Sequence, residues 1–472
     1  MNENSETKAA DSSGSQPPSG TPGARKLLSW LGLIVGCVLS ALLIAYGISA
    51  LTTSDDELLS EQTEQEAKQQ DQVAPARRES RTTLPTSALP ANPDQLKVEA
   101  EQVVLTLQQQ YPNQAPALHV AAMMYVQFRK SAEAEQLWKK CIDLSPNDAR
   151  YYLNFAAVAM DRGNSEIAAE TLQKAVDRGI SSPDLVHHLG VALTNIGKFE
   201  EAEKAIEPTL KSNPLLATHW LVLGQAQLKQ RKMEQAKQSL EKALELGHSS
   251  PAAYSALATI AAQEGDEEKV TKYRVLAKDS PEGNGLSTRE QFHVQTAAEV
   301  RGATVSTLIE AATVHTMMGN SLEAEQLLLR AITLNPSSSE SCQVLAELYR
   351  AAGMPLEERL VRQRLVDINP FELVNHLNLA QAARDSGQPE LAEAALKFAI
   401  SVQPMAAEGY LAMAQLHFES EYPEKARWYA QEAVRRNPTT EGYFLLSSIC
   451  QQMGDQAAAS AAIEEAKKLA SE

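Results

Sequence analysis

The sequence predicts an all-α fold: a solenoid of stacked helix pairs, preceded by a single transmembrane helix. A repeat period of 34 residues predicts the solenoid, and one long uncharged segment near the start predicts the membrane helix. The period is carried by Ala134, Ala168, Ala202 and Ala236, and later by Pro336, Pro370, Pro404 and Pro438. Such a period is typical of a helix–turn–helix unit that packs on its neighbours.

The repeats form two arrays. Units of the first begin at residues 115, 149, 183, 217 and 251, and units of the second begin at 305, 339, 373, 407 and, slipped by one residue, 440. Position 8 is small, as at Gly190 and Gly224, which predicts close approach of the two helices of a unit. Glycine at position 15 suits a tight turn with positive φ, and proline at position 32 ends the second helix. These glycines are Gly163, Gly197, Gly265, Gly319, Gly353, Gly387 and Gly454.

This pattern resembles the tetratricopeptide repeat family over residues 115–470. The resemblance implies a right-handed solenoid of about ten repeats that binds peptides or helices in a groove. Ala100, Val104, Leu107 and Pro112 match the second helix of a preceding half repeat and predict a capping helix. The capping helix and first array then occupy residues 93–281, and the second array occupies 305–472.

Residues 282–304 break the period. Ser280, Pro281, Gly283 and Gly285 indicate a turn-rich break, and Ser287 to Glu290 reads as a capping box that opens a helix. We expect an inserted connector helix between the arrays; a functional hinge is the alternative.

Residues 27–51 contain 25 uncharged, mainly apolar residues. As a helix they would reach about 37 Å, enough to cross a bilayer core of about 30 Å. A cleaved signal peptide is the alternative, but its apolar region is normally only about 7–15 residues long. Arg25 and Lys26 precede the segment, and Asp55, Asp56 and Glu57 follow it. This bias predicts a cytoplasmic N-terminus and a repeat domain on the periplasmic or extracytoplasmic side.

The segments that flank this helix have low apolar content. Residues 1–26 are predicted to be a disordered cytoplasmic tail, and residues 52–92 a flexible low-complexity linker. Within the membrane helix, Gly32, Gly36 and Ser40 form a small-residue face that predicts self-association as a homodimer. Glycine is common in membrane helices, so an incidental pattern is the alternative.

Composition argues against several functions. The first 26 residues carry equal numbers of acidic and basic residues, so the whole net charge of −17 lies beyond the membrane helix. An acidic domain repels phosphate backbones, which argues against nucleic acid partners. Cys141, Cys342 and Cys450 fall at packing positions, and the adjacent His187 and His188 cannot share a metal. No catalytic motif occurs, so we expect no enzyme activity, no metal and no cofactor.

The family resemblance places the partner-binding groove on positions 2, 5, 9, 12 and 13 of the first helices. In the first array these positions include His119, Met123, Leu153, Met160, His187, Val191, Leu221 and Gln225. They form a mostly neutral, apolar surface that suits an amphipathic helix or an extended peptide. The Lys and Asn pair that chaperone-binding family members carry at positions 5 and 9 is absent. In the second array the groove positions are mixed in charge.

These features together predict a membrane-anchored scaffold or assembly factor that binds protein partners in its groove, in the bacterial cell envelope. Two alternatives remain. One is a cytosol-facing receptor or adaptor on an organelle membrane, which requires the opposite topology. The other is a regulatory subunit of a membrane enzyme complex, with the chemistry supplied by another chain.

Overall fold

The structure is a computed structural model that describes residue 84 and residues 92–180, 182–280 and 296–471. The chain divides into two units, Met1–Glu79 and Ser80–Glu472, and all described residues lie in the second. These residues form helices joined by turns, without a strand, so the predicted all-helical repeat architecture is confirmed for them. None of their helices is both long and apolar enough to cross a bilayer. The predicted tail (1–26), the membrane helix (27–51) and nearly all of the linker (52–92) lie outside the described residues.

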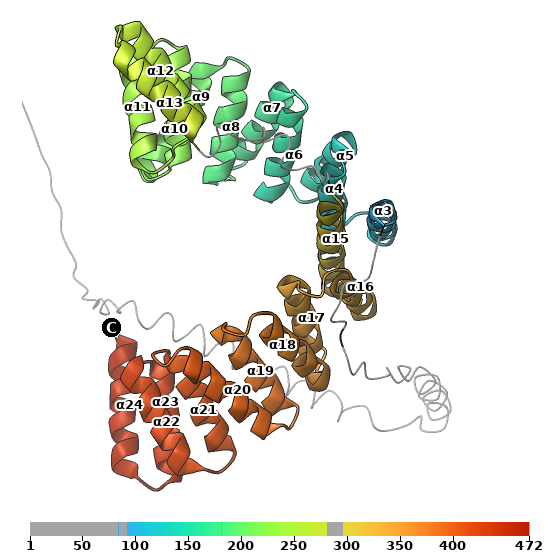
Figure 1. Ribbon diagram of the computed structural model, residues 1–472, viewed down its shortest axis with the longest axis vertical. Helices are drawn as coiled ribbons and strands as arrows, with labels where there is room; N and C mark the ends of the chain where they lie inside the picture. Colours follow the sequence, from blue (N-terminus) through green and yellow to red (C-terminus); the bar gives the residue numbers. More distant parts are fainter. Residues whose placement is uncertain (1–83, 85–91, 181, 281–295, 472) are drawn as a thin grey trace, which may run out of the picture. The chain divides into compact units, whose positions relative to one another are not determined.

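The first array consists of one leading helix and five helix pairs (Figure 1). The leading helix is α3 (Pro93–Gln110), the predicted cap. The pairs are α4 (Ala115–Gln127) with α5 (Ser131–Leu144), α6 (Ala149–Asp161) with α7 (Ser165–Asp177), α8 (Pro183–Asn195) with α9 (Phe199–Ser212), α10 (Ala217–Lys229) with α11 (Met233–Glu245), and α12 (Pro251–Glu264) with α13 (Glu267–Asp279). Every first helix begins at the residue that the 34-residue period predicts.

The second array also consists of five pairs. They are α15 (Ala297–Met317) with α16 (Ser321–Leu334), α17 (Ser339–Ala351) with α18 (Pro355–Ile368), α19 (Leu373–Asp385) with α20 (Pro389–Val402), α21 (Ala407–Glu419) with α22 (Pro423–Arg436), and α23 (Thr440–Gln452) with α24 (Gln456–Ser471). Here α15 departs from the expected boundary at 305. Residues 297–304, assigned to a separate connector, are its first turns and continue without a break. The predicted capping box at 287–290 lies outside the described residues; a capping box joins Thr296 and Glu299 instead.

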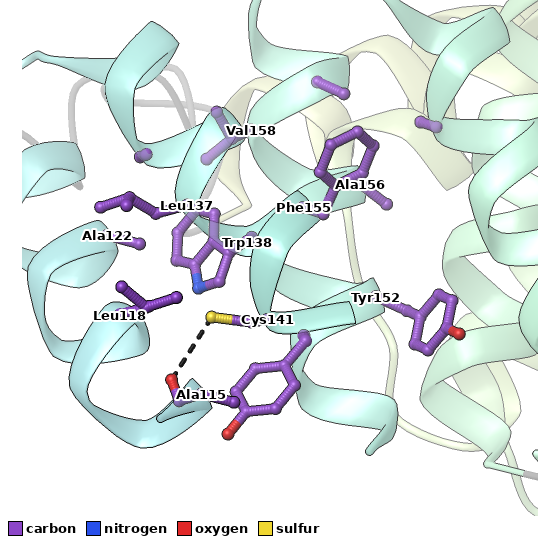
Figure 2. Packing of buried hydrophobic residues seen from close by; sticks show 14 of the residues in the cluster. Ala115, Leu118, Ala122, Leu137, Trp138, Cys141, Tyr152, Phe155, Ala156 and Val158 are labelled. Carbon is purple, nitrogen blue, oxygen red and sulfur yellow. Dashed lines mark hydrogen bonds between the residues drawn. The ribbon is translucent and has the colours of Figure 1, made fainter. Parts of the chain in front are cut away.

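Small residues let the helices of a repeat approach closely, as predicted. A methyl group built on Gly190 would lie 2.4 Å from Ile206 Cδ1, and one on Gly224 would lie 2.7 Å from Leu240 Cγ. Both distances are shorter than van der Waals contact, so alanine at position 190 would require the end of the Ile206 side chain to move, and alanine at position 224 would require Leu240 to shift. Figure 2 shows the packing at the start of the array, where Trp138 of α5 lies among residues of α4 and α6. The three cysteines at packing positions are buried and free, and burial raises the pKa of the Cys141 thiol to about 12.

Position 4 of several first helices holds a ring that donates a hydrogen bond, which the repeat pattern did not indicate. The donors are Tyr152 Oη to Pro146 O (2.9 Å), Trp220 Nε1 to Pro214 O (2.9 Å) and His376 Nε2 to Pro370 O (2.7 Å). A carbonyl oxygen can only accept, so His376 carries its proton on Nε2. Each bond ties the start of a first helix to the turn before it, and thus fixes the angle between successive repeats.

Ion pairs link α3, α5, α9, α11 and α22 to the end of the following first helix or the turn after it. They join Glu101 to Lys130 (2.6 Å), Glu135 to Arg162, Glu203 to Lys232 (2.6 Å), Lys237 to Glu264 (2.9 Å) and Arg427 to Asp455 (3.1 Å). In three of these pairs the second helix carries the glutamate, whereas Lys237 and Arg427 are cations on their second helices. The two positions therefore require opposite charges rather than particular residues. Exposed pairs contribute only about 0–1 kcal/mol each to the free energy of unfolding. Their main effect is therefore to favour the correct alignment of successive repeats.

The second array begins against the start of the first array, a contact that the repeat pattern did not indicate. Helix α15 packs on α3 and α4 (Figure 1). Thr304 Oγ1 donates to Leu96 O at 3.2 Å, and Arg330 forms a two-pronged pair with Glu99 at 2.6 and 2.8 Å. Leu96 belongs to the apolar cluster of the second array, while Ala311 and Val314 of α15 belong to that of the first. Helix α3 therefore caps both arrays.

Position 15 provides a prediction about stability. Its glycines have φ between 66° and 82°, whereas Arg129, Arg231 and Glu421 occupy the same position with φ of 61° or 62°. A side chain in this region costs about 1–2 kcal/mol. Arg231→Gly should therefore raise the free energy of unfolding by roughly 0.5–1 kcal/mol, after allowing for the greater chain entropy of glycine. The measurement is urea unfolding, with Gly197→Ala as the opposite control that should destabilise; equal or lower stability of Arg231→Gly would contradict the assignment of strain.

Candidate partner-binding groove

The eight predicted groove residues lie on four successive first helices of the first array. They are His119 and Met123 on α4, Leu153 and Met160 on α6, His187 and Val191 on α8, and Leu221 and Gln225 on α10. The contacts between α6 and α8, and between α8 and α10, hold these three helices side by side, while α5 packs between α4 and α6. Seven of the side chains are half-buried. Leu221 is only 9% exposed and belongs to an apolar core cluster, so it offers little surface to a partner.

The apolar members extend the core of the array outward. Met123, Leu153 and Met160 pack against the buried cluster of the first repeats, and Val191 packs against the cluster of Ile206, Leu210, Val222 and Leu223. Each therefore exposes one side to solvent and anchors the other. Flexible methionine side chains at such a surface can adapt to different apolar partners.

His119 is held by an aromatic partner. Trp138 Nε1 donates to His119 Nδ1 at 3.0 Å, and the ring of Tyr151 lies 5.5 Å away between centroids. An indole N–H can only donate, so the neutral imidazole carries its proton on Nε2. Burial, with a smaller effect of the Arg150 charge, lowers the pKa of His119 to about 4. His119 is therefore an uncharged element of the groove at neutral pH.

His187 lies in a group of histidines. Its ring centroid is 5.4 Å from that of His188 and 5.4 Å from that of His219. Burial and these two neighbours lower the pKa of His187 to about 4. His219 Nε2 must donate to the carbonyl oxygen of Pro183 at 2.9 Å. No set of three side chains among the described residues is arranged to hold a metal ion.

The two depressed histidine pKa values predict acid sensitivity of the first array. The unfolded chain takes up protons on these rings near pH 6.5, whereas the folded chain does so only near pH 4. The free energy of unfolding should therefore fall as pH drops from 6.5 to 4, by roughly 1–2 kcal/mol per histidine at pH 5. Urea unfolding at pH 7.5 and pH 5 measures this. The double variant His119→Gln/His187→Gln should lose less stability than the wild type between pH 7.5 and pH 5. An equal loss in both proteins would exclude these two histidines as the source of the acid sensitivity.

A second concave feature lies outside the predicted groove. A cavity of about 550 Å³ opens between α9 and α11, with α10 as its floor. Leu210, Trp220 and Leu223 line its apolar part, and Gln227 and Ser239 line a polar part. Glu203 accepts hydrogen bonds there from Gln227 at 3.3 Å, Gln230 at 2.9 Å and Lys232 at 2.6 Å. Because these groups are already bonded to one another, the cavity itself does not indicate a ligand. The other predicted site, Gly32, Gly36 and Ser40, lies outside the described residues.

Comparison with protein families identifies the repeats. A family model described as tetratricopeptide repeat matches residues 189–253, 221–269 and 377–441. A second model of the same description matches residues 440–472. No curated protein sequence matches the chain significantly.

Several solved structures are similar to parts of the chain. The crystal structure of MamA is 16% identical, with a TM-score of 0.31, and covers 34% of this chain and 94% of that one. A MamA fragment from Desulfovibrio magneticus RS-1 is 16% identical, with a TM-score of 0.32, and covers 35% and 94%. A thermophilic tetratricopeptide repeat protein of Thermus thermophilus is 22% identical, with a TM-score of 0.28, and covers 36% and 92%.

Proposed function

Because the chain contains tetratricopeptide repeats, a protein-interaction fold, we propose that it is a membrane-anchored scaffold or assembly factor. It binds a peptide or helix of a partner protein in the first-array groove and performs no chemistry of its own. The observation that carries the proposal is the row of half-buried apolar side chains on successive first helices, at Met123, Leu153, Met160 and Val191. Such a row matches the spaced apolar anchors of an amphipathic segment.

The cell membrane of the bacterial envelope is the proposed location, with the N-terminus in the cytoplasm and the repeats on the periplasmic side. The uncharged segment 27–51 and the charges on its two sides support this orientation. An anchor raises the local concentration of the groove for partners in the same membrane. A reporter fused after Glu472, with protease access to spheroplasts, measures the topology. Protection of the reporter inside the cell would reject the envelope proposal and favour the cytosol-facing adaptor.

The groove is tested with charges that leave the core intact. Lysine has nearly the length of methionine and can extend its ammonium group into solvent, so Met123→Lys/Met160→Lys should fold normally. A photo-crosslinker at position 123 in intact cells identifies the partner, and the purified pair gives the Kd. We expect the double variant to weaken this binding at least about tenfold, because two charges replace apolar anchors.

Met317→Lys/Met405→Lys is the matched control, since both methionines are exposed and lie outside the first array. It adds the same charge and should leave the Kd unchanged. Binding that survives Met123→Lys/Met160→Lys, or that both double variants weaken equally, would refute the groove.

The proposed homodimer has a separate test. Replacing both Gly32 and Gly36 by isoleucine should lower the dimer fraction in a membrane two-hybrid assay, because the bulky side chains separate the helices. Leu28→Ile/Leu33→Ile, which introduces the same side chain and keeps both glycines, serves as the control. An unchanged dimer fraction in the glycine variant would remove the claim.

A further inference from the structure

The second array exposes an apolar row on its first helices. Val374 and Leu377 lie on α19, Leu411 on α21 and Phe444 on α23, and these three helices pack side by side. Val374 is 54% exposed and Phe444 is 50% exposed, while Leu377 and Leu411 are half-buried. A small cavity of about 40 Å³ indents the same face, with Leu377, Ala412 and Leu416 in its lining. The row is therefore a partly hollowed apolar surface about three helices wide.

Exposed glutamates accompany this row. Glu340, Glu408 and Glu441 are each the second residue of a first helix, on α17, α21 and α23. Glu408 and Glu441 lie three residues before Leu411 and Phe444, and thus on the same helix face. Within the described part of the chain, none of the three glutamates forms an ion pair or a hydrogen bond. Their charges are available to a partner.

The charges at the opposite end of the same helices are already paired. Arg384 lies 3.2 Å from Glu419 and 3.6 Å from Asp385, and Arg350 and Arg362 both pair with Glu347. At the C-terminal ends of these first helices the acidic and basic side chains thus neutralise one another. At the N-terminal ends the glutamates have no basic partner among the described residues. The charge that a partner would encounter is negative, in line with the net charge of −17.

A further carboxylate lies on the same face. Glu310 on α15 is half-buried, and its only hydrogen bond within the described residues comes from Ser306 Oγ at 3.3 Å. Burial, with a smaller effect of the Glu340 charge, raises the pKa of Glu310. A cation placed between these two carboxylates would offset the repulsion between them.

Helix electrostatics do not account for the pattern. Glutamate in the first turn of a helix is favoured by the helix dipole, by about 0.3–1 kcal/mol. Yet the first helices α4, α6, α10 and α12 of the first array have no acidic residue in their first turns. Repeats of this protein therefore stack without such residues. The dipole also gives no reason for the exposed apolar row beside them.

We propose that this face of the second array binds a basic amphipathic segment of a partner protein. Apolar side chains of the segment contact Val374, Leu411 and Phe444, and its lysines or arginines lie opposite Glu340, Glu408 and Glu441. Adjacent helices are about 8–10 Å apart, which a polyproline II segment covers in about three residues while its side chains return to the same side. Basic residues at every third position would therefore place one opposite each glutamate, with one further position opposite α19, which lies between α17 and α21. The site is separate from the first-array groove and does not depend on it.

The test uses the full chain in nanodiscs of neutral lipid and two fluorescent probe peptides of about 12 residues. One carries lysine at every third position with leucine between, and the other carries glutamate in place of lysine. We expect the lysine peptide to bind, with affinity that falls as salt rises, and the glutamate peptide not to bind. Glu340→Gln/Glu408→Gln/Glu441→Gln should weaken binding about tenfold, and Phe444→Ala should weaken it about fivefold or more.

The matched control is Glu357→Gln/Glu390→Gln/Glu424→Gln. These glutamates lie in the first turns of the second helices α18, α20 and α22 and also lack ion pairs within the described residues. The control removes the same charge and should change the affinity less than twofold. An equal loss of affinity in both triple variants would show that only net charge matters, and would overturn the proposal. Unchanged affinity in Phe444→Ala would also overturn it. Loss of binding in Met123→Lys/Met160→Lys would show that the peptide binds the first array instead.

Discussion

Trp138→Ala is expected to lower the free energy of unfolding of the first array by about 3–5 kcal/mol. The indole is 2% exposed and lies at the seam of the first two repeats, among Leu118, Ala122 and Phe155 (Figure 2). Its removal leaves a cavity, and it also deprives His119 Nδ1 of its hydrogen-bond donor. Neighbouring repeats depend on one another through such seams, so the loss should spread beyond the first repeat.

Urea unfolding followed by circular dichroism gives the change in stability, and amide hydrogen exchange locates it. Trp428→Ala is the control, because Trp428 is 54% exposed and should tolerate the change with a loss of less than about 1 kcal/mol. If the two variants were equally stable, Trp138 would not have the anchoring role that its burial indicates.

Glu358→Ala should be almost as damaging in the second array, with a loss of about 3 kcal/mol or more. The side chains of Arg362 and Glu358 are 3% and 6% exposed, and Arg362 Nε lies 3.2 Å from Glu358 Oε1. Arg362 also reaches Glu347 at 2.6 Å, but Glu347 is half exposed and shares its charge with Arg350. Removing Glu358 therefore leaves a buried guanidinium with one solvated partner.

The double variant Arg362→Met/Glu358→Leu separates the cost of the lone charge from the value of the pair. Apolar side chains of similar volume avoid the desolvation penalty, so we expect the double variant to regain most of the lost stability. A double variant as unstable as Glu358→Ala would instead mean that the ion pair itself holds the repeat together.

The 34-residue period was enough to predict most of the fold. Nearly all first helices begin at the predicted residue because the determinants are local: small residues at Gly190 and Gly224, and turn residues at position 15. Arg231 and Glu421 show that the repeat imposes positive φ even where glycine is absent. The period thus encodes the geometry of a repeat more strongly than any single residue does.

Other features could not be read from the period. A repeat position does not distinguish an apolar ring from one that donates a hydrogen bond, so the bonds of Tyr152, Trp220 and His376 were missed. Groove position alone suggested that Leu221 is accessible, whereas packing from neighbouring helices buries it. The contact of α15 with α3 joins residues about two hundred positions apart, and a pattern that records only neighbours contains no signal for it.

The double role of α3 affects how the protein folds and how it can be divided. Most contacts in such an array form between adjacent helices and require little chain entropy, but Thr304 meets Leu96 across 208 residues. Closing so large a loop is slow relative to local pairing, so the junction should form last and set the overall folding rate. It also means that no cut between the arrays leaves both complete. A fragment of residues 296–471 loses its cap unless residues 93–110 are supplied with it, as a fused or a separate peptide.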